Sequence, residues 1–318
     1  MITILGPTAC GKTQLAVALA AHIDGAVVSA DSRQVYKGMD IGTGKDLNDY
    51  IYKGVAIPAY LIDICQPGEQ YNVYRYQKDF YDVYTKLTQQ QQPVILCGGS
   101  GLYIEAIVKQ YQMPDVPQNQ ELREQLQGKS LNELTLLLTQ LKKQNGTHMH
   151  NITDVDTPQR AIRAIEIECY RADTRLQETE SGNESTNIPP ISMLPISNTV
   201  IGVHIDREQR RQRITQRLHQ RLKEGMVEEV RHLLDTQCTP QQLIYYGLEY
   251  KYITEYITGK LNYDDMVSQL EIAIHQFAKR QMTWFRGMER RGTHINWIDF
   301  NIPTEEKINT IFRLTCKQ

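Results

Sequence analysis

The chain has 318 residues, 41% of them hydrophobic and 23% charged, which is enough to bury a substantial core in one large domain and a smaller one. No apolar run approaches the roughly 18 residues of a membrane span, and the chain begins in a strand-like segment without a basic or apolar leader, so we expect a cytoplasmic protein with no membrane partner. The formal net charge of −2 by itself argues against nucleic-acid binding, although the distribution of charge along the chain argues differently.

The chain begins with the pattern of a phosphate-binding loop. A strand-like run at residues 2–5 leads into Gly-x-x-x-x-Gly-Lys-Thr at 6–13, and a helical pattern follows at 14–20. The glycines let backbone N–H groups surround phosphate oxygens, and the helix adds the positive end of its dipole. Lys12 would neutralise the terminal phosphates, and the Thr13 hydroxyl would lie near Mg²⁺ or a phosphate oxygen. The pattern favours this interpretation over a turn without a ligand, but it does not identify the phosphate compound.

A second strand is predicted at residues 26–30, and Asp31 follows at its carboxyl end. Ligands of parallel α/β sheets bind at the carboxyl ends of strands, so Asp31 is expected beside the phosphate loop. Two roles remain open from position alone: a catalytic carboxylate, or the N-cap of the segment that follows.

The chain up to residue 110 continues to alternate strands and helices. Residues 36–45 contain several glycines and are typical of a loop, and residues 59–64 are typical of a third strand. Residues 72–90 carry apolar and aromatic side chains at three- and four-residue spacing, which predicts a helix with its aromatic stripe in the core. A fourth strand is predicted at 93–97, followed by a Gly-rich turn and a helix from Leu102.

Residues 110–195 predict an inserted helical region, because no further strand of the first type occurs and Pro or Gly separates several helical stretches. One helix is predicted at 131–141, and Asp-Thr-Pro at 156–158 caps and opens another. The segment 181–190 is rich in Ser, Asn, Glu and Pro and is expected to be a poorly ordered loop.

Strand character returns at residues 199–205, and an arginine-rich helix follows. Arg213 and Arg217 are four residues apart and share a face of that helix. A run of charge is usually a solvated helix surface, but arginine forks match phosphate oxygens, and the phosphate loop supplies a reason for them to bind one. The last quarter of the chain is predicted to be helical. Its helix at 266–286 ends with interleaved basic and aromatic residues, which would suit either a nucleic-acid backbone or a helix that buries its aromatic rings and exposes its cations.

Five motifs together resemble the tRNA dimethylallyltransferases, and the resemblance runs from residue 2 to about residue 298. Their order and spacing make the match specific, whereas the phosphate loop alone would fit many kinases and NTPases. The motifs are the phosphate loop at 6–13, Ser-Ala-Asp-Ser-Arg-Gln-Val-Tyr-Lys-Gly-Met-Asp-Ile-Gly-Thr at 29–43, Leu-Ile-Asp-Ile at 61–64, Gly-Gly-Ser-Gly-Leu-Tyr at 98–103 and Ala-Lys-Arg-Gln-Met-Thr-Trp-Phe at 278–285.

The resemblance implies an α/β fold, a P-loop NTPase-like parallel sheet flanked by helices, with an inserted helical domain. Residues 1–109 and 196–318 would form the catalytic domain, and residues 110–195 the insertion that clasps tRNA. The implied activity is transfer of a dimethylallyl group from dimethylallyl diphosphate to N6 of adenosine 37, in tRNAs that read codons beginning with U, with release of diphosphate. Mg²⁺ is the implied cofactor and the anticodon stem-loop of tRNA the implied partner, and we expect a monomer.

The resemblance and this chemistry also assign roles to residues. Asp31 would accept the proton of the attacking amino group, with Lys12, Thr13 and Arg217 as the other catalytic residues and Thr13 as the metal ligand. The diphosphate would be bound by Gly6, Thr8, Ala9, Cys10, Gly11, Lys12, Thr13, Arg213 and Arg217. The tRNA would be bound by Asp31, Ser32, Arg33, Gln34, Ser100, Arg123, Gln159, Arg160 and Arg163, with Arg160 and Arg163 offering forks to phosphates or base edges.

The chain departs from the family pattern in three places. The family usually has Gly-Tyr-Arg or Gly-Tyr-Lys after the arginine helix, whereas residues 245–249 read Tyr-Tyr-Gly-Leu-Glu, so a base-stacking and a basic contact are missing or rebuilt there. Ser100 stands where threonine is common and keeps the hydroxyl. The C-terminal segment has no Cys/His pairs of the zinc finger found in eukaryotic relatives, which favours a bacterial-type enzyme.

Three alternative functions remain open from the sequence. A small-molecule kinase or NTPase would bind ATP at the loop and use Asp63, at a strand end, to position Mg²⁺. A relative that prenylates free AMP, ADP or ATP, as cytokinin-forming enzymes do, is kept open by the altered step at 245–249. A non-catalytic RNA-binding protein is disfavoured by the presence of Lys12, Thr13 and Asp31.

Overall fold

The computed structural model describes the chain except for residues 112, 114–115, 148–154, 182–195 and 317–318. The chain divides into two compact units, one formed by Met1–Tyr111 with Met193–Gln318 and the other by Gln112–Ser192. The predicted loop at 181–190 lies, after its first residue, outside the described residues. No helix in the described part of the chain is long and apolar enough to cross a membrane.

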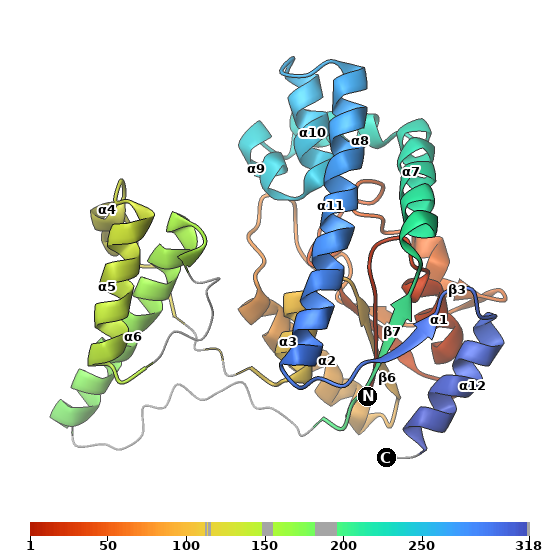
Figure 1. Ribbon diagram of the computed structural model, residues 1–318, viewed down its shortest axis with the longest axis horizontal. Helices are drawn as coiled ribbons and strands as arrows, with labels where there is room; N and C mark the ends of the chain where they lie inside the picture. The colour runs from red at the N-terminus through yellow and green to blue at the C-terminus, as the bar shows by residue number, and fades with distance from the viewer. Residues whose placement is uncertain (112, 114–115, 148–154, 182–195, 317–318) are drawn as a thin grey trace. The chain divides into compact units, whose positions relative to one another are not determined.

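A six-stranded sheet forms the centre of the larger unit, in the order β5-β2-β6-β1-β7-β8 (Figure 1). Its strands are β1 (Ile2–Leu5), β2 (Ala26–Ala30), β5 (Ala59–Tyr60), β6 (Val94–Gly98), β7 (Thr199–His204) and β8 (Asn296–Asp299). Every neighbouring pair in this sheet is parallel. β2 and β6 are buried along their whole length, as expected of strands that helices cover on both faces. The predicted parallel α/β sheet is confirmed.

Helices cover both faces of this sheet (Figure 1). On one face, α1 (Lys12–Ile23) and α12 (Thr304–Thr315) pack over inward side chains such as Ile4. On the other, α2 (Val73–Gln89) and α3 (Gly101–Val108) pack against each other and against β6. Successive side chains of a strand point to opposite faces, so each central strand contributes to both cores.

The aromatic stripe of α2 lies in the core, as predicted. Tyr76 and Phe80 are fully buried, and the Tyr76 ring stacks on Tyr103 with the ring centroids 4.3 Å apart. The Tyr76 hydroxyl donates to the Ser29 carbonyl oxygen at 3.1 Å, which satisfies a buried polar group. This contact holds α2 on β2 close to the strand end that precedes Asp31.

The third predicted strand, residues 59–64, is wrong beyond its first two residues. β5 is only Ala59–Tyr60, because Leu61 and Asp63 have positive φ angles of 60° and 54° that turn the chain out of the sheet. The Asp63 carboxylate accepts a hydrogen bond from Nζ of the buried Lys45. The patterns did not predict β8, a 3₁₀-helix at Leu47–Tyr50 or a hairpin of β3 (Ile51–Tyr52) and β4 (Val55–Ala56). They predicted a helical last quarter but gave no bounds for α12.

Further helices follow β7 up to residue 290. They are α7 (Arg207–Lys223), α8 (Met226–Thr236), α9 (Pro240–Tyr245), α10 (Leu248–Ile257) and α11 (Tyr263–Arg290). The predicted arginine-rich helix is α7, and it buries Ile214 and Leu218. In α11, Phe285 is fully buried whereas Lys279 and Arg286 are exposed. Of the two interpretations of this helix, the structure favours the one that buries aromatic residues and exposes cations.

The smaller unit is helical in its described part. It contains α4 (Gln120–Leu126), α5 (Leu131–Gln144) and α6 (Pro158–Ser181), which confirms the helices predicted at 131–141 and after 156–158. α5 begins at a capping box, in which the Ser130 and Glu133 side chains each accept from the other's backbone N–H. Leu134 and Leu138 of α5 pack with Ile165 of α6 in the core of this unit.

A buried carboxylate, Glu166 of α6, links α6 to α4. It accepts from Arg123 Nε at 2.6 Å and Nη2 at 2.9 Å, from Arg163 Nη1 at 3.1 Å and from the Asn119 N–H at 3.0 Å. Burial by itself raises the pKa of Glu166, but the hydrogen bonds from both arginines and from Asn119 outweigh burial and hold that pKa below the ordinary value. The ionised, paired carboxylate therefore stabilises this unit at neutral pH.

We expect Glu166→Gln to weaken the helical unit at pH 7 by about 1–3 kcal/mol, because the arginines lose an ionised acceptor. The effect should shrink in acid. A carboxyl whose folded pKa is depressed contributes stability that is complete above the unfolded pKa, about 4.3 for glutamate, and is lost as the pH falls through the folded value. Hydrogen exchange of the α4 and α6 amides in the full chain, measured at several pH values, reports both effects.

Glu124→Gln is the matched control for this experiment, because Glu124 is exposed on α4 and, among the described residues, accepts only from the exposed Gln120. In Glu124→Gln, the α4 and α6 amides should be protected from hydrogen exchange as strongly as in the unaltered chain. Equal protection in the two variants across the pH range would contradict the stabilising role of Glu166.

Candidate active site

The phosphate loop lies between β1 and α1, as predicted. Ala9 and Gly11 have positive φ angles of 62° and 74°, which fold the loop over the start of α1. The Thr8 N–H donates to Gln281 Oε1 at 2.9 Å, and Gln281 Nε2 donates to the Gly99 carbonyl oxygen at 3.0 Å. This glutamine of α11 therefore ties the phosphate loop to the turn after β6.

Asp31 lies half-buried at the carboxyl end of β2. Its Oδ1 accepts a hydrogen bond from the Arg33 N–H at 2.9 Å, so the carboxylate caps the turn that follows the strand. Among the described residues, Oδ2 has no hydrogen-bond partner. The Ser100 hydroxyl accepts from the Ser32 N–H at 2.9 Å, which joins the turns after β2 and β6. Asp31 thus has one oxygen held by the protein and one without a hydrogen-bond partner among the described residues.

Three arginines spaced four residues apart lie on the side of α7 that faces the phosphate loop. Arg213 Nε donates to the Ala9 carbonyl oxygen at 2.9 Å. Arg217 is half-buried, and Arg221 is almost fully buried and pairs with Asp46 at 3.3 Å. These arginines connect α7 both to the phosphate loop and to the segment that precedes the 3₁₀-helix.

The electrostatics around Arg217 suit a polyanion. Burial and the nearby charge of Arg221 lower the pKa of Arg217 to about 10. Both guanidinium groups lie against Gly44, where an added Cβ would come within 2.5 Å of Arg221 Nη2. Two cations held close together and partly out of water repel each other, and a bound anion with two or more charges would relieve that repulsion. With a pKa of about 10, Arg217 is still protonated at pH 7 and can bind an anionic ligand.

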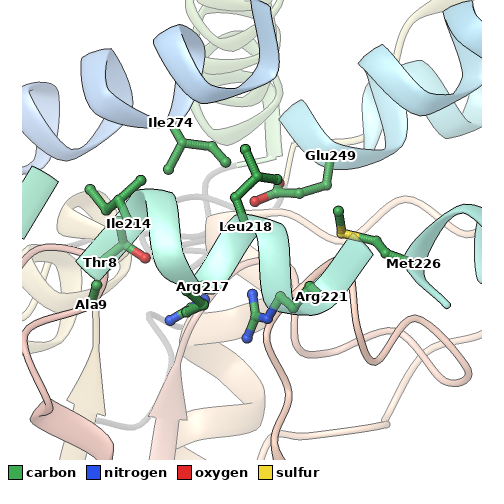
Figure 2. A pocket seen from close by; sticks show the side chains of 9 residues that line it. All are labelled: Thr8, Ala9, Ile214, Arg217, Leu218, Arg221, Met226, Glu249 and Ile274. Atoms are coloured by element: carbon green, nitrogen blue, oxygen red, sulfur yellow. The ribbon is translucent and has the colours of Figure 1, made fainter. Parts of the chain in front are cut away.

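Two pockets open around Ala9 and Arg217, which line both. The first is charged, and its lining includes Gly11, Lys12, Thr13, Asp46, Asp49 and Arg213. The second is lined by Thr8, Ala9, Ile214, Arg217, Leu218, Arg221, Met226, Glu249 and Ile274. In Figure 2, Ile214, Leu218 and Ile274 gather on one side of α7 and the two guanidinium groups lie on the opposite side. The first pocket offers cations and backbone N–H groups to phosphate, and the second adds apolar walls.

Comparison with known proteins identifies the family to which this chain belongs. A sequence profile of IPP transferases matches residues 34–288. The chain belongs to the IPP transferase family. It is 57% identical to tRNA dimethylallyltransferase 1 of Parabacteroides distasonis, over 100% of this chain and 98% of that protein. It is 54% identical to tRNA dimethylallyltransferase 2 of Porphyromonas gingivalis, over 99% and 98% of the two chains. The family and the bacterial type predicted from the motifs are confirmed.

Solved structures share the fold of this IPP transferase. The tRNA isopentenylpyrophosphate transferase of Bacillus halodurans has a TM-score of 0.67 at 28% identity, with 99% of this chain and 95% of that chain covered. A eukaryotic dimethylallyltransferase whose structures follow its action on tRNA has a TM-score of 0.74 at 21% identity, with 94% of this chain and 73% of that chain covered. At that identity the similarity is evidence for the fold alone. The predicted P-loop NTPase-like fold is confirmed.

The residues predicted for the site of this IPP transferase fall into three groups, apart from Gly6, Thr8 and Cys10 of the phosphate loop. Of these, Thr8 lines the second pocket. Lys12, Thr13, Arg213 and Arg217 line the charged pocket together with Gly11 and Ala9. Asp31, Ser32, Arg33, Gln34 and Ser100 lie where β2 and β6 end. Arg123, Gln159, Arg160 and Arg163 belong to the helical unit.

The arginines of the helical unit are already engaged by the protein. Arg123 gives two N–H groups to Glu166, and Arg163 gives Nη1 to Glu166 and Nη2 to the Val116 carbonyl oxygen at 2.7 Å. Arg160 is exposed and pairs with Asp156 at 3.1 Å. Only part of each guanidinium therefore remains for RNA, which the sequence pattern did not indicate.

The segment at 245–249, where the chain departs from the family pattern, is built around two tyrosines. Tyr246 is buried, and its hydroxyl accepts from the Gly68 N–H at 2.6 Å. Tyr245 is 58% exposed, and the Arg33 guanidinium lies 5.7 Å from its ring centroid. Burial raises the pKa of Glu249, an effect that the charges of Arg221 and Arg217 partly oppose. An exposed aromatic ring and a cation are thus present, supplied by Tyr245 and Arg33.

Several site residues escaped the sequence interpretation. Arg221 continues the four-residue spacing of Arg213 and Arg217, so the helical period could have revealed it. Gln281 lies inside the motif at 278–285, but nothing there indicated that it binds the phosphate loop. Asp46 and Asp49 line the charged pocket without any sequence signal.

Proposed function

We propose that this chain transfers the dimethylallyl group of dimethylallyl diphosphate to N6 of adenosine 37 in tRNAs that read codons beginning with U. The observation that carries the proposal is the charged pocket, where Lys12, Thr13, Arg213 and Arg217 meet the phosphate loop. The relatives named tRNA dimethylallyltransferase, at 57% and 54% identity over the whole chain, support the substrates.

In the proposed reaction the N6 nitrogen attacks C1 of the dimethylallyl group. The C1–O bond breaks, its electron pair leaves on the diphosphate, and the proton of the amino group passes to Asp31. The free Oδ2 suits this role, because Oδ1 is held by the Arg33 N–H and keeps the carboxylate oriented. Lys12, Arg217 and the loop N–H groups stabilise the charge on the departing diphosphate.

Mg²⁺ fits the residues of the charged pocket. Thr13, Asp46 and Asp49 line it and carry one hydroxyl and two carboxylates, and Mg²⁺ prefers oxygen ligands from one or two carboxylates, water and substrate phosphates. Within the described residues no cluster of three or more His, Cys, Asp or Glu side chains makes a complete metal site, so phosphate oxygens would share the coordination. A bound Mg²⁺ would supply positive charge to the leaving diphosphate.

We further propose that tRNA contacts residues of both units. Adenosine 37 has to leave the anticodon stack, which costs a few kcal/mol and favours stacking contacts near Asp31. Tyr245 and Arg33 offer an exposed ring and a cation there. Gln159 and Arg160, exposed at the start of α6, offer contacts in the helical unit.

The kinase alternative has little support in the structure. Asp63, the acid that it would use, is paired with the buried Lys45 and lines neither pocket. By contrast, the charged pocket at the phosphate loop is lined by residues suited to a diphosphate donor, namely Lys12, Thr13, Arg213 and Arg217.

The test is mass spectrometry of tRNA from cells with and without this protein, with N6-dimethylallyladenosine expected only when the protein is present. A second arm incubates the purified chain with dimethylallyl diphosphate and either tRNA carrying A36-A37-A38 or free AMP, ADP and ATP. Product on tRNA alone supports the proposal. Product on free nucleotides alone, or hydrolysis of ATP without prenyl transfer, would replace it.

A further inference from the structure

Glu229 of α8 binds a backbone segment far from it in the sequence. Oε2 accepts from the Asp40 N–H at 2.8 Å and the Ile41 N–H at 2.7 Å, and Oε1 accepts from the Gly42 N–H at 3.0 Å. Oε1 also accepts from the Tyr250 hydroxyl at 2.7 Å. Successive backbone N–H groups directed at one carboxylate form an anion nest, here occupied by the protein's own side chain.

The segment at residues 40–46, which we call the 40–46 loop, is short and internally braced. The Lys45 N–H donates to the Asp40 carbonyl oxygen at 2.9 Å, which closes the loop on itself. The Lys45 side chain is buried, and its ammonium binds the carboxylates of Asp40 and Asp63 and the Tyr36 carbonyl oxygen. These bonds tie the two ends of the 40–46 loop together, because Lys45 binds Asp40 through both its N–H and its ammonium group.

The far end of the 40–46 loop supports Arg217 and Arg221. We call the two pockets around Ala9 and Arg217 the donor site, because the proposed function places the prenyl donor there. Gly44 has φ +70°, and its Cα faces the guanidinium groups of Arg217 and Arg221 so closely that a Cβ there would overlap both. Asp46 pairs with Arg221 at 3.3 Å. The loop therefore forms the wall against which the two guanidinium groups rest.

We propose that Glu229 is a positioning residue of the donor site, which holds the 40–46 loop in place so that Arg217 and Arg221 are fixed where a diphosphate binds. The inference rests on the proposed function for the identity of the donor, but its physical claim concerns the diphosphate group alone. Without the carboxylate, the N–H groups of residues 40–42 lose their acceptor and the loop can withdraw from Arg217. The guanidinium groups then have more rotamers to lose when the anion binds, and affinity falls.

The test compares Glu229→Gln with Glu228→Gln. Glutamine keeps the size of the side chain but directs an NH₂ group at backbone donors, so the nest is broken without a cavity. Glu228 is the exposed neighbour on the same helix and serves as the matched control. Titration calorimetry with inorganic diphosphate should show a Kd about tenfold higher or more for Glu229→Gln and no change for Glu228→Gln. In the transfer assay, KM for dimethylallyl diphosphate should rise while KM for tRNA stays the same.

A second pair of variants tests the other end of the loop and guards against misfolding of Glu229→Gln. Gly44→Ala and Gly38→Ala place a similar strain on a positive-φ glycine. Position 44 meets guanidinium groups, whereas no atom of the described residues lies within 4 Å of a Cβ at Gly38. Gly44→Ala should weaken diphosphate binding and Gly38→Ala should not.

The outcomes separate this inference from the proposed function. Unchanged diphosphate affinity in a folded Glu229→Gln, or equal effects in the two glycine variants, overturns the positioning role. Loss of affinity for diphosphate and tRNA alike also overturns it, because a general loss of structure would then be the cause. If the unaltered chain binds diphosphate but transfers no dimethylallyl group, the proposed function fails while the role of Glu229 is still decided by the binding measurements.

Discussion

Asp31→Asn is expected to lower kcat by about 10²- to 10⁴-fold and to leave the affinity for the prenyl donor nearly unchanged. The asparagine carbonyl oxygen can still accept the Arg33 N–H, which Asp31 Oδ1 accepts at 2.9 Å, so the turn after β2 should survive. What is lost is the acceptor for the proton of the attacking amino group. Single-turnover transfer to tRNA measures the rate of the chemical step, and a separate titration with the prenyl donor measures its affinity.

Two further variants sharpen this result. Asp31→Ala removes both the turn cap and the base, so any extra loss relative to Asp31→Asn reports the capping contribution. Asp24→Asn is the control, because Asp24 is exposed after α1 with φ 51°, a conformation that asparagine tolerates well. Near-normal turnover in Asp31→Asn would limit Asp31 to its structural role in the turn.

Arg217→Ala is expected to reduce kcat/KM for the donor by about 10²- to 10³-fold, since a cation that faces the leaving diphosphate is removed from a partly buried site. Arg217→Lys should recover only part of this, because an ammonium cannot form the two parallel hydrogen bonds of a guanidinium. Arg211→Ala, an exposed position on the same helix, should behave like the unaltered enzyme.

The depressed pKa of Arg217 adds a pH dependence to this prediction. With a pKa of about 10, the guanidinium is protonated at pH 7 and loses its proton as the pH rises towards 10. Donor affinity in the unaltered chain should therefore fall over that range, and it should not in Arg217→Ala. Similar alkaline profiles in the two proteins would assign the loss of affinity to another group.

Local chemistry made part of this fold predictable. The phosphate loop has fixed residue types at fixed spacing, and β2 and β6 are fully buried, so each forms a short continuous apolar run. β8 escaped notice because it lies at the edge of the sheet and is only partly buried, which leaves no such run. α12 includes a buried lysine, Lys307, whose ammonium donates to the Phe300 carbonyl oxygen at 2.6 Å, a pairing that no hydrophobic pattern indicates.

The site was predictable where it follows from a motif or a period and not where it depends on long-range contacts. Lys12 was placed by the phosphate-loop motif, and Asp31 by its position at the end of a strand. Glu229 and Gln281 act on residues about two hundred positions or more earlier in the chain, so only the folded structure reveals their contacts. Tyr245 is similar, because its relation to Arg33 depends on how α9 ends against the turn after β2.

The central place of β1 in the sheet has a consequence for how the enzyme forms on the ribosome. β1 pairs with β6 at residues 95–98 and with β7 at residues 199–202, so both of its hydrogen-bonded neighbours are synthesised long after it. Pairings of such high contact order form slowly, since a long loop must close before they contribute. In the insertion, α4 and α5 pack against α6, and all three helices are complete before β7 emerges. The phosphate loop, although it is made first, is therefore among the last parts of the nascent chain to reach its working shape.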